Sequence, residues 1–309
     1  MAQPPAIGTR RRSTRPGPAR RRRRENIEGW LFAAPIALGI AVFQLIPLAV
    51  SVYTSLTSWD GIAAPKFIGL RNYTDLITND FIFLQVLRNT LLFTVVSVPL
   101  TVVCAVVLAL LGILRVRGLA FFRTAFFAPY VMNVVAIGYV WSFLYQPDGV
   151  LNSLLGSVGI QGPSWLADAN WVLIAVIVVN VWQGVGYPMV ILLGGLQNIP
   201  ADLYDAARLD GAGRWSRLVR VTLPLLTPQI FFVVLAQFIS SFQVFGLIYV
   251  MTQGGPAFSS SVYIYYLWQV AFSQGKFGYA SAMAWLMVVL IGVIAWIQWR
   301  LHRKWVFSG

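Results

Sequence analysis

Two clusters of amide, hydroxyl and aromatic side chains interrupt stretches of the sequence that are otherwise apolar. The first cluster contains Asn180, Trp182, Gln183, Gly184, Gly186, Tyr187 and Pro188, and the second contains Gln237, Ser240, Ser241, Gln243 and Gly246. Amides and hydroxyls in hydrocarbon need hydrogen-bond partners, so these side chains must face other helices or a wet cavity. Aromatic rings beside uncharged amides suit a neutral polyhydroxy ligand. Hydrogen bonding between helices is the alternative, and for any single residue it stays open.

A polar segment between these clusters has the pattern of a short capped helix. Pro200 suits a first helical turn, where its missing N–H costs nothing. Leu203, Ala206 and Ala207 fall on one face at helical spacing, and Gly211 is a natural stop residue. Because alanines let a partner backbone approach closely, this face predicts a docking site for another protein. An amphipathic linker lying on the bilayer is the alternative.

The elements that must position these residues are membrane-spanning helices. Hydrophobic residues make up 58% of the 309 residues and charged residues only 11%, which is more apolar surface than a soluble domain of this length can bury. Six apolar runs are long enough to cross ~30 Å of hydrocarbon. They lie near residues 30–56, 89–113, 119–145, 171–196, 225–251 and 277–300. Because the runs are continuous rather than alternating, we expect an all-α polytopic membrane protein.

Basic residues are divided unevenly between the two sides of a six-span arrangement. Of the 23 lysines and arginines, 19 fall on one side, and the other side has Lys66, Arg71, Arg88 and Lys276. This bias places both termini in the cytoplasm. Residues 1–27 predict a disordered basic tail that contacts anionic lipid rather than nucleic acid. Residues 28–309 then form one six-span domain, with a long cytoplasmic loop at about 197–224.

The residues of the apolar runs argue against other classes of membrane protein. No Asp, Glu, Lys or His lies in their interiors, which argues against an ion-coupled secondary transporter. The runs also lack the paired carboxylates, His/Cys cluster or Ser/His/Asp set of an enzyme, and the chain has no Walker-type phosphate loop. The lone cysteine, Cys104, and the lone histidine, His302, support no metal site. We therefore expect a transport subunit with no catalytic residue and no metal or cofactor of its own.

The polar segment resembles the loop shared by permease subunits of binding-protein-dependent ABC importers. The family pattern is Glu-Ala-Ala, three residues, Gly, nine residues, then an aliphatic residue, any residue, Leu and Pro. This chain keeps every spacing, with Asp205-Ala206-Ala207, Gly211, Val221, Leu223 and Pro224. Asp205 stands where the family has glutamate, which keeps the charge but removes one methylene from any salt link made there.

The resemblance extends over residues 28–305 and is strongest to the carbohydrate branch, near the maltose-type and glycerol-phosphate-type permeases. The segments that carry it, besides the loop, include 182–187, 195–200 and 249–256. It implies the type I ABC importer permease fold, with six transmembrane helices in the bacterial inner membrane.

The resemblance also implies partners and a mechanism. Such permeases pair with a second permease to form one translocation path, and an extracytoplasmic binding protein delivers the substrate. The loop helix sits in a groove of one of two ATP-binding cassette ATPases, which bind ATP and Mg and whose closure switches the pore between inward- and outward-facing states. The coupling residues implied are Tyr204, Asp205, Ala206, Ala207, Asp210, Gly211 and Ala212.

Maltose-type relatives hold the sugar with residues on the spans that flank the loop. The positions that match here are Trp182, Gly184, Tyr187, Gln237, Ser240 and Ser241, and the amide chemistry adds Gln183 and Gln243. We therefore expect a permease subunit that carries a sugar, an oligosaccharide or a related polyol. The same importer carrying glycerol 3-phosphate or a glycerophosphodiester is the alternative, and an ion-coupled secondary transporter is a second one.

Overall fold

Residues 18–114 and 117–305 are described in this computed structural model, and the chain falls into two units, Met1–Tyr53 and Thr54–Gly309. In the first unit, α1 (Pro18–Ile40) continues through a π-turn, η1 (Ala41–Leu45), into α2 (Ile46–Ser55). Arginine and alanine favour helix, and residues 18–27 are helical where the sequence analysis expected a disordered tail. The rest of that predicted tail, residues 1–17, lies outside the described residues.

The described part of the second unit is mostly helical, as predicted. A two-residue antiparallel ladder joins β1 (Thr57–Ser58) to β2 (Lys66–Phe67). The helices before the polar loop are α3 (Arg71–Thr78), α4 (Phe81–Gly112), α5 (Leu119–Val131), α6 (Val134–Leu144), α7 (Val150–Ser157), α8 (Val172–Gly184) and α9 (Gly186–Gln197). The others are α10 (Ala201–Leu209), α11 (Arg214–Arg217), η2 (Leu218–Thr222), α12 (Leu223–Phe242), α13 (Gly246–Met251), α14 (Tyr263–Trp268), η3 (Gln269–Ser273) and α15 (Phe277–Trp305).

The described helices coincide with the predicted membrane runs, although three of the runs, 119–145, 171–196 and 225–251, are broken. By length and composition, four helical stretches are able to cross a membrane: Gly29–Ser55, Phe81–Gly112, Arg214–Met251 and Phe277–His302. Two pairs, α5 with α6 and α8 with α9, are long enough only together, and they bend by 99° and 44°. The described residues therefore hold four spans, or six if each bent pair is one span.

Local chemistry explains where these helices begin and break. The α4 helix starts at Phe81, well before the predicted residue 89, because the Asp80 carboxylate accepts a hydrogen bond from the Phe83 N–H at 2.8 Å and caps the helix. The bend between α8 and α9 falls at Val185, between two glycines and shortly before Pro188, which has no N–H to donate. The prediction that this segment would loosen the helix is confirmed.

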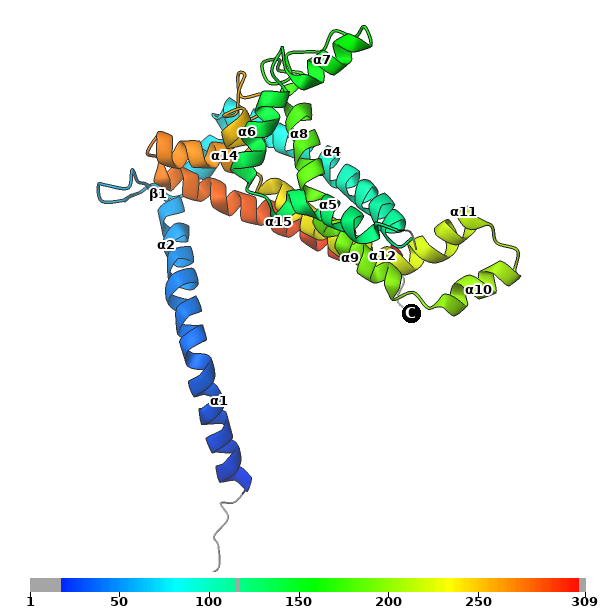
Figure 1. The fold of residues 1–309 in the computed structure, drawn as a ribbon. Coiled ribbons are helices and arrows are strands. Elements are labelled where there is room, and N and C mark those ends of the chain that lie inside the picture. Colours follow the sequence, from blue (N-terminus) through cyan, green and yellow to red (C-terminus); the bar gives the residue numbers. More distant parts are fainter. Residues whose placement is uncertain (1–17, 115–116, 306–309) are drawn as a thin grey trace, which may run out of the picture. The chain divides into compact units, whose positions relative to one another are not determined.

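Several helices of the second unit pack side by side around α4 (Figure 1). The α4 helix contacts α8, α9 and α12, and α12 in turn contacts α15. The hairpin of α10 and α11 lies at one end of this group, and α7 lies at the other end. The rings of Trp299 and His302, at the end of α15, pack on Phe231 in the first half of α12, so α15 ends at the same side as the hairpin.

Buried polar side chains on α4 fix the neighbouring elements. The Asn89 amide donates to the Ser261 carbonyl at 3.0 Å, and the hydroxyls of Thr94 and Ser241 lie 2.9 Å apart. A hydrogen bond that is shielded from water must be kept if the residue is to stay buried. The second bond therefore holds the rotation of α12 about its own axis relative to α4, which decides which α12 side chains are exposed.

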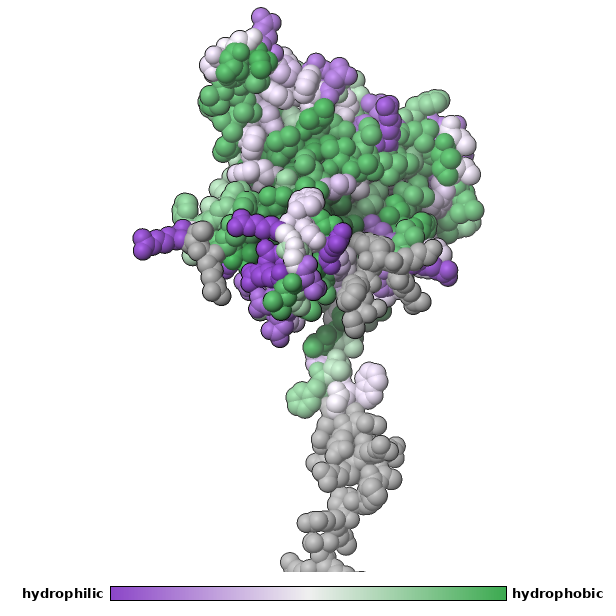
Figure 2. Space-filling model, turned by 90° about the vertical axis from the view of Figure 1, so that its right-hand side faces the viewer, coloured by the Kyte–Doolittle hydropathy of each residue, from purple (hydrophilic) through white to green (hydrophobic). Residues whose placement is uncertain are grey.

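The surface of the second unit is mainly apolar (Figure 2). Large apolar side chains on α4, among them Val95 at 68% and Val103 at 60%, are exposed. Hydrophilic residues gather over the end that carries α10 and α11, which faces the viewer in Figure 2. Exposed apolar surface of this extent needs lipid or another subunit to cover it.

Candidate functional site

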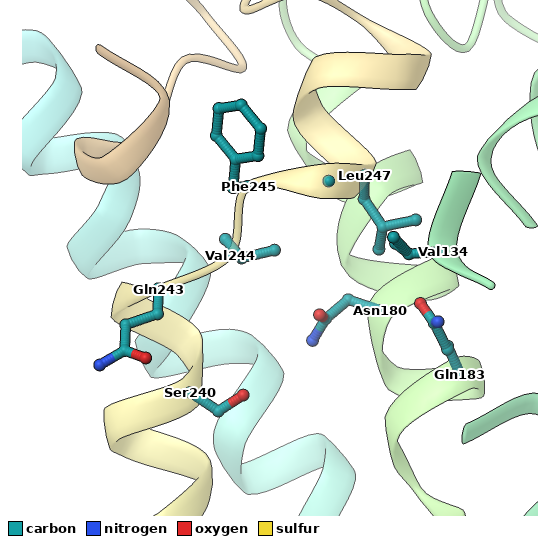
Figure 3. Close-up of a pocket in the computed structure, with 9 residues that line it drawn as sticks. Val134, Asn180, Gln183, Ser240, Gln243, Val244, Phe245 and Leu247 are labelled. Carbon is teal, nitrogen blue, oxygen red and sulfur yellow. The ribbon is translucent and has the colours of Figure 1, made fainter. Parts of the chain in front are cut away.

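A cavity of about 270 Å³ lies between α8 and the end of α12 (Figure 3). Asn180 and Gln183 reach it from α8, Ser240 reaches it from the last turn of α12, and Gln243 reaches it from the residue directly after α12. Asn180 and Ser240 point toward each other across the space. Val134 and the segment 244–247 complete the lining. All four polar side chains are uncharged, and together they offer both donors and acceptors.

The cavity lies beside a break in the helical stretch Arg214–Met251. The α12 helix ends at Phe242, the next three residues are not helical, and α13 begins at Gly246. A Cβ atom on Gly246 would lie 2.8 Å from Cγ1 of Val134, closer than side chains approach. Glycine at this position therefore lets the start of α13 pack tightly against the start of α6, and the broken segment borders the cavity.

The α8 side of the cavity depends on another close approach. A Cβ atom on Gly186 would lie 2.5 Å from the carbonyl oxygen of Phe126 on α5. Only glycine fits there without moving the backbone of one helix. The α8–α9 break is thus packed directly on α5, and this contact holds Gln183 and Asn180 in place within the last two turns before the bend.

The structure brings together three of the eight path residues that the sequence predicted. Gln183, Ser240 and Gln243 line the cavity, and two of these three are exposed, so the cavity is open to the outside of the chain. Gly184 and Gln237 are half-buried and do not line it. The two glutamines that amide chemistry alone suggested are therefore among the residues that meet.

The remaining predicted path residues lie in aromatic or buried settings. Trp182 is 41% exposed and meets Trp141 edge to face, with ring centroids 5.5 Å apart. Tyr187 stacks on Tyr130 at 5.2 Å. Ser241 differs, because it is only 5% exposed and hydrogen-bonded to Thr94. Its hydroxyl is part of the contact between α12 and α4, not of the cavity wall.

Asn180 and Phe245 are among the lining residues that were not assigned to the path from sequence. Asn180 belongs to the first polar cluster, and its position three residues before Gln183 puts both amides on one helix face. From this spacing, Asn180 could have been predicted to line the same cavity as Gln183. Phe245 lies in the non-helical segment after α12, and no periodic pattern predicts where such a residue points.

The predicted docking helix is present as α10, with Pro200 as its first flanking residue. The chain leaves the helix through Gly211, whose φ of +79° is the left-handed conformation expected of a stop glycine. Asp205 forms an ion pair with Arg208 at 2.8 Å, and both side chains are mostly exposed. The helix thus has the predicted start and stop.

The two alanines of the predicted docking face are not equivalent. Ala206 is exposed, as is Asp210, whereas Ala207 and Ala212 are half-buried. The Ala212 N–H donates to the Ala207 carbonyl at 2.9 Å, which closes the turn after the helix. The exposed face of α10 is therefore centred on Ala206, with Leu209 at 91% exposure beside it.

Tyr204 points back toward the membrane helices. Its hydroxyl lies 3.1 Å from the hydroxyl of Thr222, the last residue of η2, which leads into α12. Thr222 is 5% exposed and Tyr204 is half-buried. Of the seven predicted coupling residues, Tyr204 is thus the one whose side chain forms a hydrogen bond with another element of the described structure.

Residues 83–306 match the model of a protein family described as the binding-protein-dependent transport system inner membrane component. The chain belongs to this family. Two curated relatives support the assignment of this inner membrane component. It is 38% identical over 288 residues to the probable ABC transporter permease protein YesP of Bacillus subtilis (strain 168), covering 92% of this chain and 93% of YesP. The chain is also 35% identical over 285 residues to the lactose transport system permease protein LacF of Rhizobium radiobacter, and the match covers 90% of this chain and 95% of LacF.

Among solved structures, this inner membrane component shares its fold with a chain of a bacterial alginate ABC transporter. That chain was crystallised in complex with an alginate pentasaccharide-bound periplasmic protein. The TM-score is 0.81 at 19% sequence identity, over 94% of this chain and 98% of the other. The fold predicted from the loop motif, that of a type I ABC importer permease, is confirmed at this level, as is the family.

Proposed function

We propose that this inner membrane component forms half of the translocation path of an ATP-driven importer for a carbohydrate. The observation that carries the proposal is the cavity between α8 and α12, where Asn180, Gln183, Ser240 and Gln243 present uncharged donors and acceptors. Hydroxyl groups of a sugar both donate and accept hydrogen bonds, so amides and hydroxyls pair with them without any charge. LacF, which is named as a lactose transport system permease, is a relative whose sequence is matched over 95% of its length.

The open cavity fits a path that is completed by a second chain. Two of its polar residues, Ser240 and Gln243, are exposed in the single chain. Polar groups at membrane depth need cover or a wet cavity. We therefore infer a second homologous permease opposite α8 and α12, with six spans per chain and both termini on the cytoplasmic side.

The ATPase contact is assigned to the exposed face of α10. Ala206, Leu209 and Asp210 are exposed there, and the ion pair of Asp205 with Arg208 lies beside them. Two ATP-binding cassette ATPases would bind ATP and Mg, and an extracytoplasmic binding protein would deliver the substrate. This chain itself supplies the path and the docking helix.

A phosphate ester is the second candidate substrate class, and the cavity disfavours it. Phosphate recognition relies on arginine or lysine, and none of the residues lining the described cavity is charged. Glycerol 3-phosphate or a glycerophosphodiester would enter such a site without a counter-charge. A neutral sugar, oligosaccharide or polyol is the better match.

The test begins with affinity purification of the tagged chain from native membranes in mild detergent, followed by mass spectrometry. A second permease, an ATPase and an exported binding protein should be recovered with it. The binding protein is then screened against neutral sugars and glycerol phosphates, and its ligand is used for uptake into proteoliposomes that contain ATP. A folded chain recovered alone, or uptake driven by an ion gradient without ATP, would contradict the proposal.

Orientation is tested separately with single cysteines in a Cys104→Ser background. Leu209, at the tip of α10, is 91% exposed, and Val158, just after α7, is 70% exposed. A membrane-impermeant maleimide added to intact spheroplasts should label a cysteine at Val158 and spare one at Leu209. The reverse pattern would invert the proposed topology.

A further inference from the structure

One hydrogen bond links the predicted docking helix to the span that carries half of the cavity. The Tyr204 hydroxyl on α10 and the Thr222 hydroxyl at the foot of α12 are 3.1 Å apart. Thr222 is buried, and its hydroxyl also donates to the Arg217 carbonyl at 3.3 Å, so toward Tyr204 it acts as the acceptor of the phenol hydrogen. Among the described residues, this is the only side-chain hydrogen bond between α10 and another element, because Arg208 pairs with Asp205 of the same helix.

The covalent route between the two helices is compliant by comparison. The chain leaves α10 at Leu209 and passes through Asp210–Gly213 before α11 begins. Gly211 has a φ of +79°, and no atom would lie within 4 Å of a Cβ placed on it. The hydrogen bonds that close this turn lead back to α10 and not to α11, so the turn moves with α10. Rotations about the backbone of Gly213, where a Cβ atom would also meet nothing within 4 Å, then absorb the displacement before α11.

The hydrogen bond between Tyr204 and Thr222 joins α10 to the helix that leads to the cavity. Thr222 ends the π-turn η2, and α12 then runs from Leu223 to Phe242 without a break. A helix of this length spans roughly 30 Å. Ser240, in its last turn, lines the cavity. A displacement applied at Thr222 is thus carried along one helix to the polar side chains of the path.

We propose that Tyr204 is a positioning residue that clamps α10 to the foot of α12, so that movement of the docking helix reaches the cavity. This inference rests on the proposed function, in which an ATPase moves α10. It gives Tyr204 a different role from the one implied by the family resemblance, which treats the whole segment as ATPase contact. The phenol faces Thr222 within the chain, while Ala206 and Leu209 present the outer face.

The experiment measures transmission without knowledge of the substrate. Ser240→Cys in a Cys104→Ser background places a thiol in the cavity, and its labelling rate with a small methanethiosulfonate reagent is measured in the purified complex. Rates are compared without nucleotide and with ATP plus vanadate. The tested variants are Tyr204→Phe, Thr222→Val and the two combined. The controls are Thr222→Ser, which keeps a hydroxyl, and Tyr139→Phe, which removes a hydroxyl that is 67% exposed on α6.

Each single variant should reduce the nucleotide-dependent change in labelling rate by roughly fivefold, the value of one hydrogen bond of about 1 kcal/mol. The double variant should lose no more than either single variant, because both remove the same bond. Both controls should keep the full response. In every variant the ATPase should still co-purify, which separates transmission from folding and docking.

Two results would overturn the inference in distinguishable ways. A full nucleotide response in Tyr204→Phe and Thr222→Val, with ATPase bound, would show that the clamp does not transmit movement. If the complex carries only the two reporter substitutions, retains the ATPase and shows no nucleotide-dependent change in labelling at position 240, movement of α10 does not reach the cavity. Absence of the ATPase from the unmodified complex would refute the proposed function itself.

Discussion

Replacing Gly211 with leucine tests whether the turn after α10 is packed against a partner. In the chain by itself the position has a φ of +79°, and a Cβ atom would meet nothing within 4 Å. The substitution therefore introduces backbone strain but no clash within the protein. Any effect beyond strain must come from a surface that is supplied by another chain.

Gly159 provides a matched control for the strain. It has a φ of +78°, and a Cβ atom there would also meet nothing within 4 Å. It follows α7, at the opposite end from α10. A side chain in the left-handed region costs about 1–2 kcal/mol, so Gly159→Leu and Gly211→Leu should lose similar thermal stability. Overpacking of an interface costs a further 1–3 kcal/mol or so, which corresponds to roughly a 5- to 150-fold weaker complex.

The assay compares both variants for melting temperature of the detergent-solubilised chain and for ATPase retained during purification. We expect equal melting shifts and a loss of ATPase only in Gly211→Leu. Equal ATPase retention and equal uptake in the two variants would refute the proposal that a partner packs on this turn. A much larger melting shift at Gly211 would instead point to a packing role inside the chain.

Three further substitutions separate the path from the scaffold. Gln243→Ala should raise the KM for uptake roughly 2- to 10-fold, the value of one neutral hydrogen bond, and leave assembly intact; an unchanged KM would remove Gln243 from the path. Ser241→Ala breaks the buried bond to Thr94 and should lower the unfolding temperature, at a cost of about 1 kcal/mol, without changing KM; a raised KM with unchanged stability would return it to the path. Asp80→Asn should lower the unfolding temperature as well, because the carboxylate accepts from two tyrosine hydroxyls and a backbone N–H. Burial and the bond to Asp80 raise the pKa of Tyr266. The stability that the neutral Tyr266 hydroxyl contributes should therefore be lost only as the pH rises above about 10, the ordinary pKa of tyrosine. Melting temperatures measured between pH 7 and about pH 11 would check this.

The membrane runs were predictable because continuous apolar stretches leave few alternatives. Their internal shape was less so. The run at 119–145 contains one proline and one asparagine in an apolar setting, yet it bends by 99°. The bend follows from the Asn133 side chain, which accepts from the Val135 N–H and starts a new helix. A capping residue inside an apolar run competes with helix continuation, and only tertiary packing decides between them.

The site was predictable at the level of clusters, and not at the level of neighbouring residues. Ser240 and Ser241 are chemically identical in sequence, but consecutive helical residues point about 100° apart. Ser240 lines the cavity and Ser241 bonds to Thr94 on α4. The choice between them depends on how α12 is rotated, which is set by a contact with a residue nearly 150 positions away. No local pattern contains that information.

The break in α12 has a consequence for how substrate recognition should be dissected. Within the stretch Arg214–Met251, the helix stops at Phe242 and restarts at Gly246 beside the cavity. The last carbonyls of one helix and the first N–H groups of the next have no helical partners, and the residues between them line the cavity that we propose for the substrate. Main-chain groups of this kind survive every side-chain substitution. An alanine scan of the cavity will therefore recover less than the full binding energy, and insertion of a single residue at 243–245 is the change that would reveal the rest.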